Sequence, residues 1–308
     1  MTQQRFRLAA SGGCPDLFVR RQPAAVGALP VLYIHGATFP SALSVGFDFG
    51  GGSWLDDWHA RGFDAWAFDF AGFGESGRYP EMAAPADAHP PLGRAPDAAA
   101  QIARVIDLIR HETGRPGVSL VSHSWGSMPA GLAAITRPDT VERVVMFAPI
   151  ACRVATVTVP AAKAPAWREV TNEAQHARFV EDVPRDHPPV LVAFERWAPA
   201  YLDSDPGALM RMPPAVRVPA GPAADIAAAW AGQLAWNPAV LTRPFFVVRG
   251  EWDSLCTDSD AAMLLDAATS APERRDIKLP SGTHLMHLET GRRVLYEAIG
   301  RALKGEKP

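Results

Sequence analysis

The sequence GVSLVSHSWGSMPAGLAAIT, residues 117–136, joins a short apolar strand pattern directly to an apolar helical pattern. Residues 117–122 predict a buried strand, and residues 125–136 predict the helix that follows it. Ser124 falls at the turn between these two elements. A turn this tight holds its central residue in a strained backbone conformation and projects its side chain out over the sheet. Ser124 is therefore a candidate nucleophile in a fold of the α/β class.

Such a turn needs small residues two positions before and two positions after its centre, because larger side chains would collide with the adjoining strand and helix. Around Ser124 these positions hold Ser122 and Gly126. The same test fails for Ser122 as the centre, because Leu120 precedes it by two, and for Ser127, which lies inside the predicted helix. A serine before a helix also commonly serves as its N-cap. Whether Ser124 is a nucleophile or only an N-cap therefore depends on the residues that could act with it.

A serine hydroxyl needs a base to accept its proton, and that base needs a carboxylate to orient it. Asp253 stands just past a predicted strand at residues 243–250, and His284 lies in the loop after the last predicted strand, residues 274–280. The chain order Ser, Asp, His is the one that accompanies this type of turn in α/β folds. Since the carboxyl ends of parallel strands meet at one edge of a sheet, we expect the three side chains to converge.

Strand and helix patterns alternate along most of the chain. This alternation predicts a mostly parallel sheet covered by helices on both faces. Strands are expected at residues 30–35, 64–70, 117–122, 141–149, 243–250 and 274–280, and helices at residues 53–62, 95–114, 125–136, 258–270 and 289–304.

The alternation stops at residue 151. Residues 151–241 hold many of the 29 prolines and several tryptophans, without clean strand alternation, and predict an inserted, mainly helical segment. The expected organisation is therefore a first part of the core at residues 1–150, the insertion at 151–241 and a second part of the core at 242–308.

Composition excludes several classes of partner and cofactor. The 308-residue chain carries a formal net charge of −3, so nothing in its charge favours nucleic acid or an anionic membrane. Cys14, Cys152 and Cys256 are too few and too far apart for a disulfide framework or a metal site, and no metal-binding or phosphate-binding motif is present. We expect no metal, no cofactor, no membrane span and, without a signal-peptide pattern, a cytoplasmic location. The oligomeric state is not predicted.

At this point the chain resembles the α/β-hydrolase superfamily, whose fold has a mostly parallel central sheet, helices on both faces and, in many members, an inserted cap. The resemblance covers nearly the whole length. It rests on YIHGAT (33–38), FDFAGFGESG (68–77), SHSWG (122–126), RGEWD (249–253) and SGTHLMHLE (281–289).

The resemblance implies Ser124 as the nucleophile, Asp253 as the acid and His284 as the base. His287 fits less well as the base, because in the family a glutamate often follows the histidine by five residues, and Glu289 has that spacing from His284.

The resemblance also implies that the backbone N–H groups of Ala37 and Trp125 form an oxyanion hole, and that residues 151–241 form a cap over the active site. Aromatic residues in the cap predict an apolar pocket roof, with Phe194, Trp197 and Trp230 as candidate substrate-binding residues.

The predicted function is a serine hydrolase that cleaves a carboxylic ester, or else a thioester or amide, of a small molecule with an apolar part. A lyase or an acyltransferase with the same triad is the main alternative, and a ligand receptor that keeps the fold is another.

Overall fold

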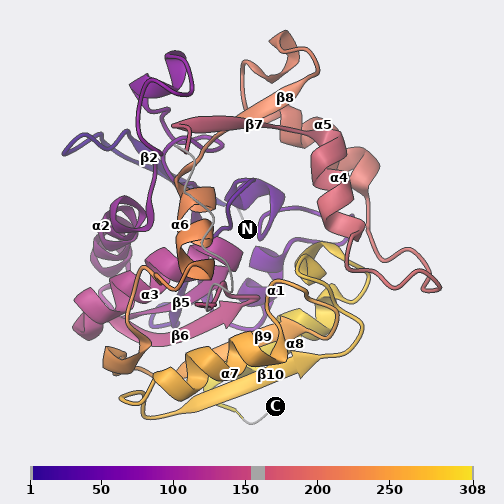
Figure 1. Ribbon diagram of the computed structural model, residues 1–308. Coiled ribbons are helices and arrows are strands. Elements are labelled where there is room, and N and C mark those ends of the chain that lie inside the picture. Colours follow the sequence, from indigo (N-terminus) through magenta and orange to yellow (C-terminus); the bar gives the residue numbers. More distant parts are fainter. Residues whose placement is uncertain (1–2, 154–163, 307–308) are drawn as a thin grey trace.

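The computed structural model describes residues 3–153 and 164–306 and contains one eight-stranded sheet (Figure 1). The strand order is β1-β2-β4-β3-β5-β6-β9-β10, and β2 runs antiparallel to both of its neighbours while all other pairs are parallel. The strands are β1 (Gln4–Leu8), β2 (Leu17–Gln22), β3 (Pro30–Ile34), β4 (Asp64–Phe68), β5 (Val118–His123), β6 (Val141–Phe147), β9 (Phe245–Gly250) and β10 (Arg274–Leu279).

Helices cover both faces of this sheet because the central strands are apolar on both sides. In β3, Leu32 and Ile34 belong to one buried cluster, which α2 (Ala95–Thr113), α3 (Ser127–Thr136) and α7 (Asp258–Ala267) share. Val31 and Tyr33 face the opposite cluster, which α1 (Trp54–Ala60) and α8 (Arg292–Lys304) complete. The predicted architecture, a mostly parallel sheet with helices on both faces, is confirmed.

The connection after β5 is short. A single 3-10 turn, η3 (Ser124–Gly126), carries the chain from β5 into α3. The ends of β9 and β10 lie on the same edge of the sheet, because both run parallel to β5 through β6. The sequence segments that hold Ser124, Asp253 and His284 therefore meet at one edge.

The segment predicted as an insertion lies over that edge, and its described residues form helices together with a small antiparallel ribbon, β7 and β8 (Figure 1). Its helices are α4 (Asn172–Val180), α5 (Phe194–Asp203) and α6 (Gly221–Trp230), and its strands are β7 (Trp167–Thr171) and β8 (Ala215–Pro219). The sequence prediction missed these two strands, since each is only five residues long and 43 residues separate them.

Trp197 joins the insertion to the core. Its indole Nε1 donates a hydrogen bond of 2.8 Å to the carbonyl oxygen of Leu43, and the side chain is almost fully buried. Its ring also packs edge-on against Phe39 from the loop after β3, at 5.3 Å between centroids.

None of the helices in the described part of the chain has the length and apolar character needed to span a membrane.

Candidate active site

The turn at Ser124 has the strained backbone that the sequence predicts for it. Ser124 has φ of +55°, a left-handed conformation that is costly for a residue other than glycine. An added Cβ on Gly126 would lie 2.4 Å from the carbonyl oxygen of His35, so only glycine fits there. Ser122 is completely buried, and its hydroxyl has no hydrogen-bond partner among the described residues. The role of Ser122 here is to be small.

Three side chains form a continuous hydrogen-bonded chain at this edge. Ser124 Oγ lies 2.8 Å from His284 Nε2, and His284 Nδ1 lies 3.0 Å from both carboxylate oxygens of Asp253. Asp253 and His284 are both less than 5 % exposed. This is the geometry in which a base can accept a hydroxyl proton while a carboxylate fixes its tautomer.

The carboxylate of Asp253 is itself held in place by the loop after β9. Its Oδ1 accepts backbone hydrogen bonds from Leu255, at 2.8 Å, and from Cys256, at 3.0 Å. Burial alone would raise the pKa of Asp253, but His284 and these two N–H groups outweigh it and lower the pKa below its usual value. Asp253 therefore remains an anion at neutral pH.

His123 and His287 support the loop of His284. His123 Nε2 lies 2.9 Å from the carbonyl oxygen of His284, and the rings of His123 and His287 have centroids 4.6 Å apart. Burial, followed by the neighbouring histidines, lowers the pKa of His123 well below its usual value, and burial lowers that of His287 to about 3. Both are neutral packing residues, and His287 makes no hydrogen bond through its ring to a described residue.

Glu289 is fully buried beside the same loop. Its carboxylate accepts hydrogen bonds from the hydroxyl and, at 3.4 Å, the backbone N–H of Thr283. Burial raises the pKa of Glu289 to about 7. Glu289 therefore anchors the residue that precedes His284 and contacts neither Ser124 nor Asp253 by a hydrogen bond.

Ala37 and Trp125 are the two residues whose backbone N–H groups are expected to form an oxyanion hole. Ala37 lines the same cavity as Ser124, and its N–H has no hydrogen-bond acceptor among the described residues. Trp125 follows Ser124 directly, and its side chain turns away into the core, where Nε1 donates to Asp225 Oδ2 at 3.0 Å. Asp225, at the centre of α6, also accepts a 2.7 Å hydrogen bond from the backbone N–H of Ala95.

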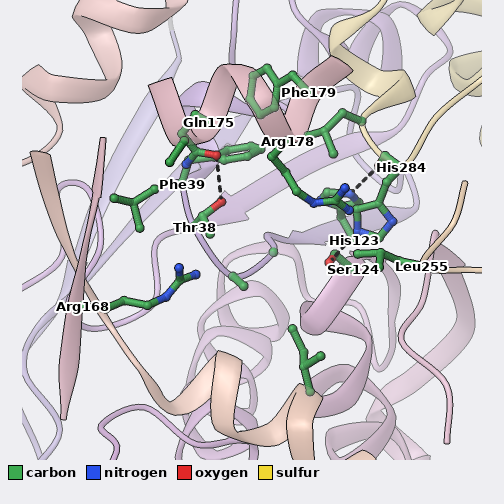
Figure 2. Close-up of a pocket in the computed structure, with 16 residues that line it drawn as sticks. Thr38, Phe39, His123, Ser124, Arg168, Gln175, Arg178, Phe179, Leu255 and His284 are labelled. Carbon is green, nitrogen blue, oxygen red and sulfur yellow. Dashed lines mark hydrogen bonds between the residues drawn. The ribbon is translucent and has the colours of Figure 1, made fainter. Parts of the chain in front are cut away.

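A cavity of about 230 Å³ lies between Ser124 and the insertion (Figure 2). Ser124 and His284 form part of its floor, and α4 and β7 supply its roof. Its apolar wall consists mainly of Phe39, Val170, Phe179, Ile226, Leu255 and Leu285, and its polar groups include Thr38, His123, Arg168, Gln175 and Arg178.

The three aromatic residues expected to bind substrate do not line this cavity. Trp197 is packed between core and insertion, Phe194 stacks on Trp197 with centroids 5.8 Å apart, and Trp230 lies under the guanidinium of Arg153 at 5.0 Å. Burying such rings stabilises the insertion, and that is the role that their contacts give them here.

The roof also departs from the apolar surface that its aromatic content predicts. Arg168 and Arg178 reach the cavity from β7 and α4. Sequence reasoning missed them because nothing in the local sequence says which side of a short strand or helix faces the pocket.

Comparison with known families agrees with this geometry. The sequence profile of the family described as serine aminopeptidase, S33, matches residues 53–291, more than three quarters of the chain. The chain belongs to this family. It is thus an α/β hydrolase, as the motifs around Ser124, Asp253 and His284 indicate. A comparison with curated proteins gave no significant match.

Solved structures share the fold over nearly their whole length. The epoxide hydrolase VrEH1 from Vigna radiata has a TM-score of 0.67 at 14 % identity, with 98 % of each chain covered. The thioesterase domain from the curacin biosynthetic pathway has a TM-score of 0.62 at 16 % identity, covering 97 % of this chain and 99 % of that one. A structure from a study of carboxylesterases of the thaumarchaeon Nitrososphaera gargenis has a TM-score of 0.62 at 12 % identity, with 97 % of each chain covered. At these identities the likeness concerns the fold.

Proposed function

We propose that this hydrolase cleaves a carboxylic ester, or the related thioester or amide, through an acyl-enzyme on Ser124. The observation that carries the proposal is the hydrogen-bonded chain from Ser124 through His284 to Asp253, with the serine facing a cavity. The strained turn and the two backbone N–H groups at Ala37 and Trp125 are what an acyl transfer needs beside it.

In the first half of the reaction, Ser124 Oγ attacks the carbonyl carbon while His284 Nε2 accepts the hydroxyl proton. The N–H groups of Ala37 and Trp125 stabilise the negative charge that develops on the carbonyl oxygen. His284 then donates its proton to the leaving alcohol, thiol or amine, which departs and leaves the acyl group on Ser124.

In the second half, water attacks the acyl-enzyme and His284 accepts one of its protons. The second tetrahedral intermediate collapses, His284 returns the proton to Ser124 Oγ, and the carboxylic acid leaves. Throughout, ionised Asp253 keeps the proton of His284 on Nδ1 and stabilises the imidazolium.

Labelling of Ser124 tests this proposal. A fluorophosphonate should modify Ser124, and Ser124→Ala should abolish labelling and lower the rate of ester hydrolysis by about 10⁴-fold or more. Thermal unfolding of the variant serves as the control for folding. Unchanged hydrolysis in Ser124→Ala would contradict the proposal.

The same triad could serve a lyase or an acyltransferase, in which water does not take the acyl group. Turnover in ¹⁸O-labelled water separates these reactions from hydrolysis. Hydrolysis places one solvent oxygen in the acid product, whereas an acid formed without solvent oxygen would exclude it.

A further inference from the structure

The β7–β8 ribbon separates its charged residues between two faces. Glu169 lies directly opposite Arg217 in the antiparallel register, and its Oε1 is 3.1 Å from both Arg217 Nη2 and Arg211 Nε. On this outer face the arginines are therefore paired with a carboxylate. Neighbouring residues of a strand point to opposite faces, so Arg168 and Val170 point the other way, toward the cavity.

Arg168 has no such partner. Among the described residues it makes no ion pair or hydrogen bond, and its Nε atom is buried without an acceptor. Figure 2 shows its side chain extending from β7 into the cavity, well separated from Ser124 and His284. Burial lowers the pKa of Arg168, yet a guanidinium stays charged in a protein. Removing such a charge from water is costly unless an anion compensates it.

The rest of the cavity lining adds no negative charge. Its residues include a second cation, Arg178, but no aspartate or glutamate. Arg178 differs from Arg168 in having a counter-ion, Glu181 at the end of α4, although its Nη1 and Nη2 are buried without a hydrogen-bond acceptor among the described residues. Gln175 is only 2 % exposed and its Nε2 donor has no acceptor among the described residues, while its Oε1 accepts a 3.5 Å hydrogen bond from Thr38.

We propose that the substrate of the Ser124 site carries a carboxylate and that Arg168 binds it, with Gln175 as a second donor. This inference rests on the proposed acyl-enzyme function and names its substrate class. A carboxylate matches the fork of donors that a guanidinium presents. The cavity, about 230 Å³, is smaller than the roughly 300–1,000 Å³ of most ligand pockets, which suits a small acid with one ester or amide bond.

Matched ester pairs test the preference on either side of the scissile bond. The mono-p-nitrophenyl ester of adipic acid is compared with p-nitrophenyl adipamate, and 4-acetoxybenzoate with 4-acetoxybenzamide. Within each pair only the charge of the distant group differs. A charge-assisted hydrogen bond predicts a kcat/KM about 10- to 100-fold higher for the carboxylate in at least one pair.

Variants assign the preference to Arg168. Arg168→Gln should reduce the ratio within the preferred pair to near unity, and Arg168→Lys should retain part of it. Arg196→Gln is the matched control, because Arg196 is an exposed arginine of the same insertion outside the cavity and should leave the ratio unchanged. The ratio is taken within one protein preparation, so a loss of folded enzyme does not alter it.

A binding measurement makes the result independent of catalysis. Calorimetry on Ser124→Ala should show 4-acetoxybenzoate or monomethyl adipate binding at least about 10-fold more tightly than its amide counterpart, and Ser124→Ala with Arg168→Gln should lose this difference. Equal binding of acid and amide, binding of neither, or a preference that survives Arg168→Gln would overturn the inference.

If Ser124 is labelled by fluorophosphonate but no preference exists, only this inference fails. If the wild type is neither labelled nor active, the proposed function fails, and calorimetry still decides the carboxylate site.

Discussion

The turn at Ser124 and the β7–β8 ribbon face one cavity, yet their polar groups are organised in opposite ways. At the turn, Ser124, His284 and Asp253 satisfy one another within 3.0 Å, and the backbone is fixed in one strained conformation. On the ribbon, Arg168 faces the cavity without a partner among the described residues. Under the proposed function, the reacting groups are organised before substrate arrives, whereas the proposed recognition group, Arg168, is completed by the substrate.

The largest loss of activity should come from disrupting the hydrogen-bonded chain of Ser124, His284 and Asp253. Asp253→Asn keeps the shape of the carboxylate but leaves His284 in the wrong tautomer, and we expect kcat to fall by about 10⁴-fold. Carboxylate binding by Arg168 should be unaffected, because Asp253 does not line the cavity. Steady-state kinetics and calorimetry on the same preparation check both halves. A loss of carboxylate binding that matches the loss of kcat would show that binding at Arg168 depends on the groups around Ser124.

The strained turn should tolerate no added atom. Gly126→Ala places a Cβ 2.4 Å from the carbonyl oxygen of His35, and we expect the free energy of unfolding to fall by about 3 kcal/mol. Activity should fall as well, since the backbone next to Ala37 must shift. Gly51→Ala is the control, because a Cβ there meets nothing within 4 Å. Urea unfolding measures the difference, and equal stability of the two variants would contradict the packing argument.

Glu289, which anchors the loop of His284, should make the free energy of unfolding depend on pH. The pKa of Glu289 is raised to about 7 in the folded protein, so between about pH 4.5 and 7 the folded state binds more protons through it than the unfolded state. Its contribution to the free energy of unfolding is therefore present at low pH and declines as pH rises to 7. Relative to Glu289→Gln, the wild type should lose about 2 kcal/mol across this window.

The comparison of two proteins is necessary for this measurement. The buried histidines, with lowered pKa values, make an opposite contribution to pH dependence, and it is common to wild type and variant. Urea unfolding at pH 5 and at pH 7.5 gives the four values required. An identical pH dependence in both proteins would show that folding does not raise the pKa of Glu289.

The three residues of the hydrogen-bonded chain are also the ones that could be predicted from the sequence. Ser124 and Asp253 each follow a strand with a strong apolar pattern, His284 follows the last strand of the alternation, and the small residues around Ser124 are a local signal. The hydrogen bond from Trp125 to Asp225 is not local and could not be predicted.

The roof required information that no single stretch contains. The cavity-facing side of β7 depends on its pairing with β8, so Arg168 had no signal of its own. Aromatic content pointed instead to Phe194, Trp197 and Trp230, but large apolar rings mark burial more reliably than recognition. Trp197 shows this directly, since it is 2 % exposed.

The hydrogen bonds of Asp225 bear on how this enzyme could be rebuilt. Asp225 belongs to the inserted segment, yet it satisfies the indole N–H of Trp125 and the first backbone N–H of α2. Cutting out residues 151–241, or exchanging them for the insertion of a relative, would leave those two buried donors without an acceptor beside Ser124. An exchange that ends before Gly221, so that α6 of this chain is retained, would keep both hydrogen bonds of Asp225.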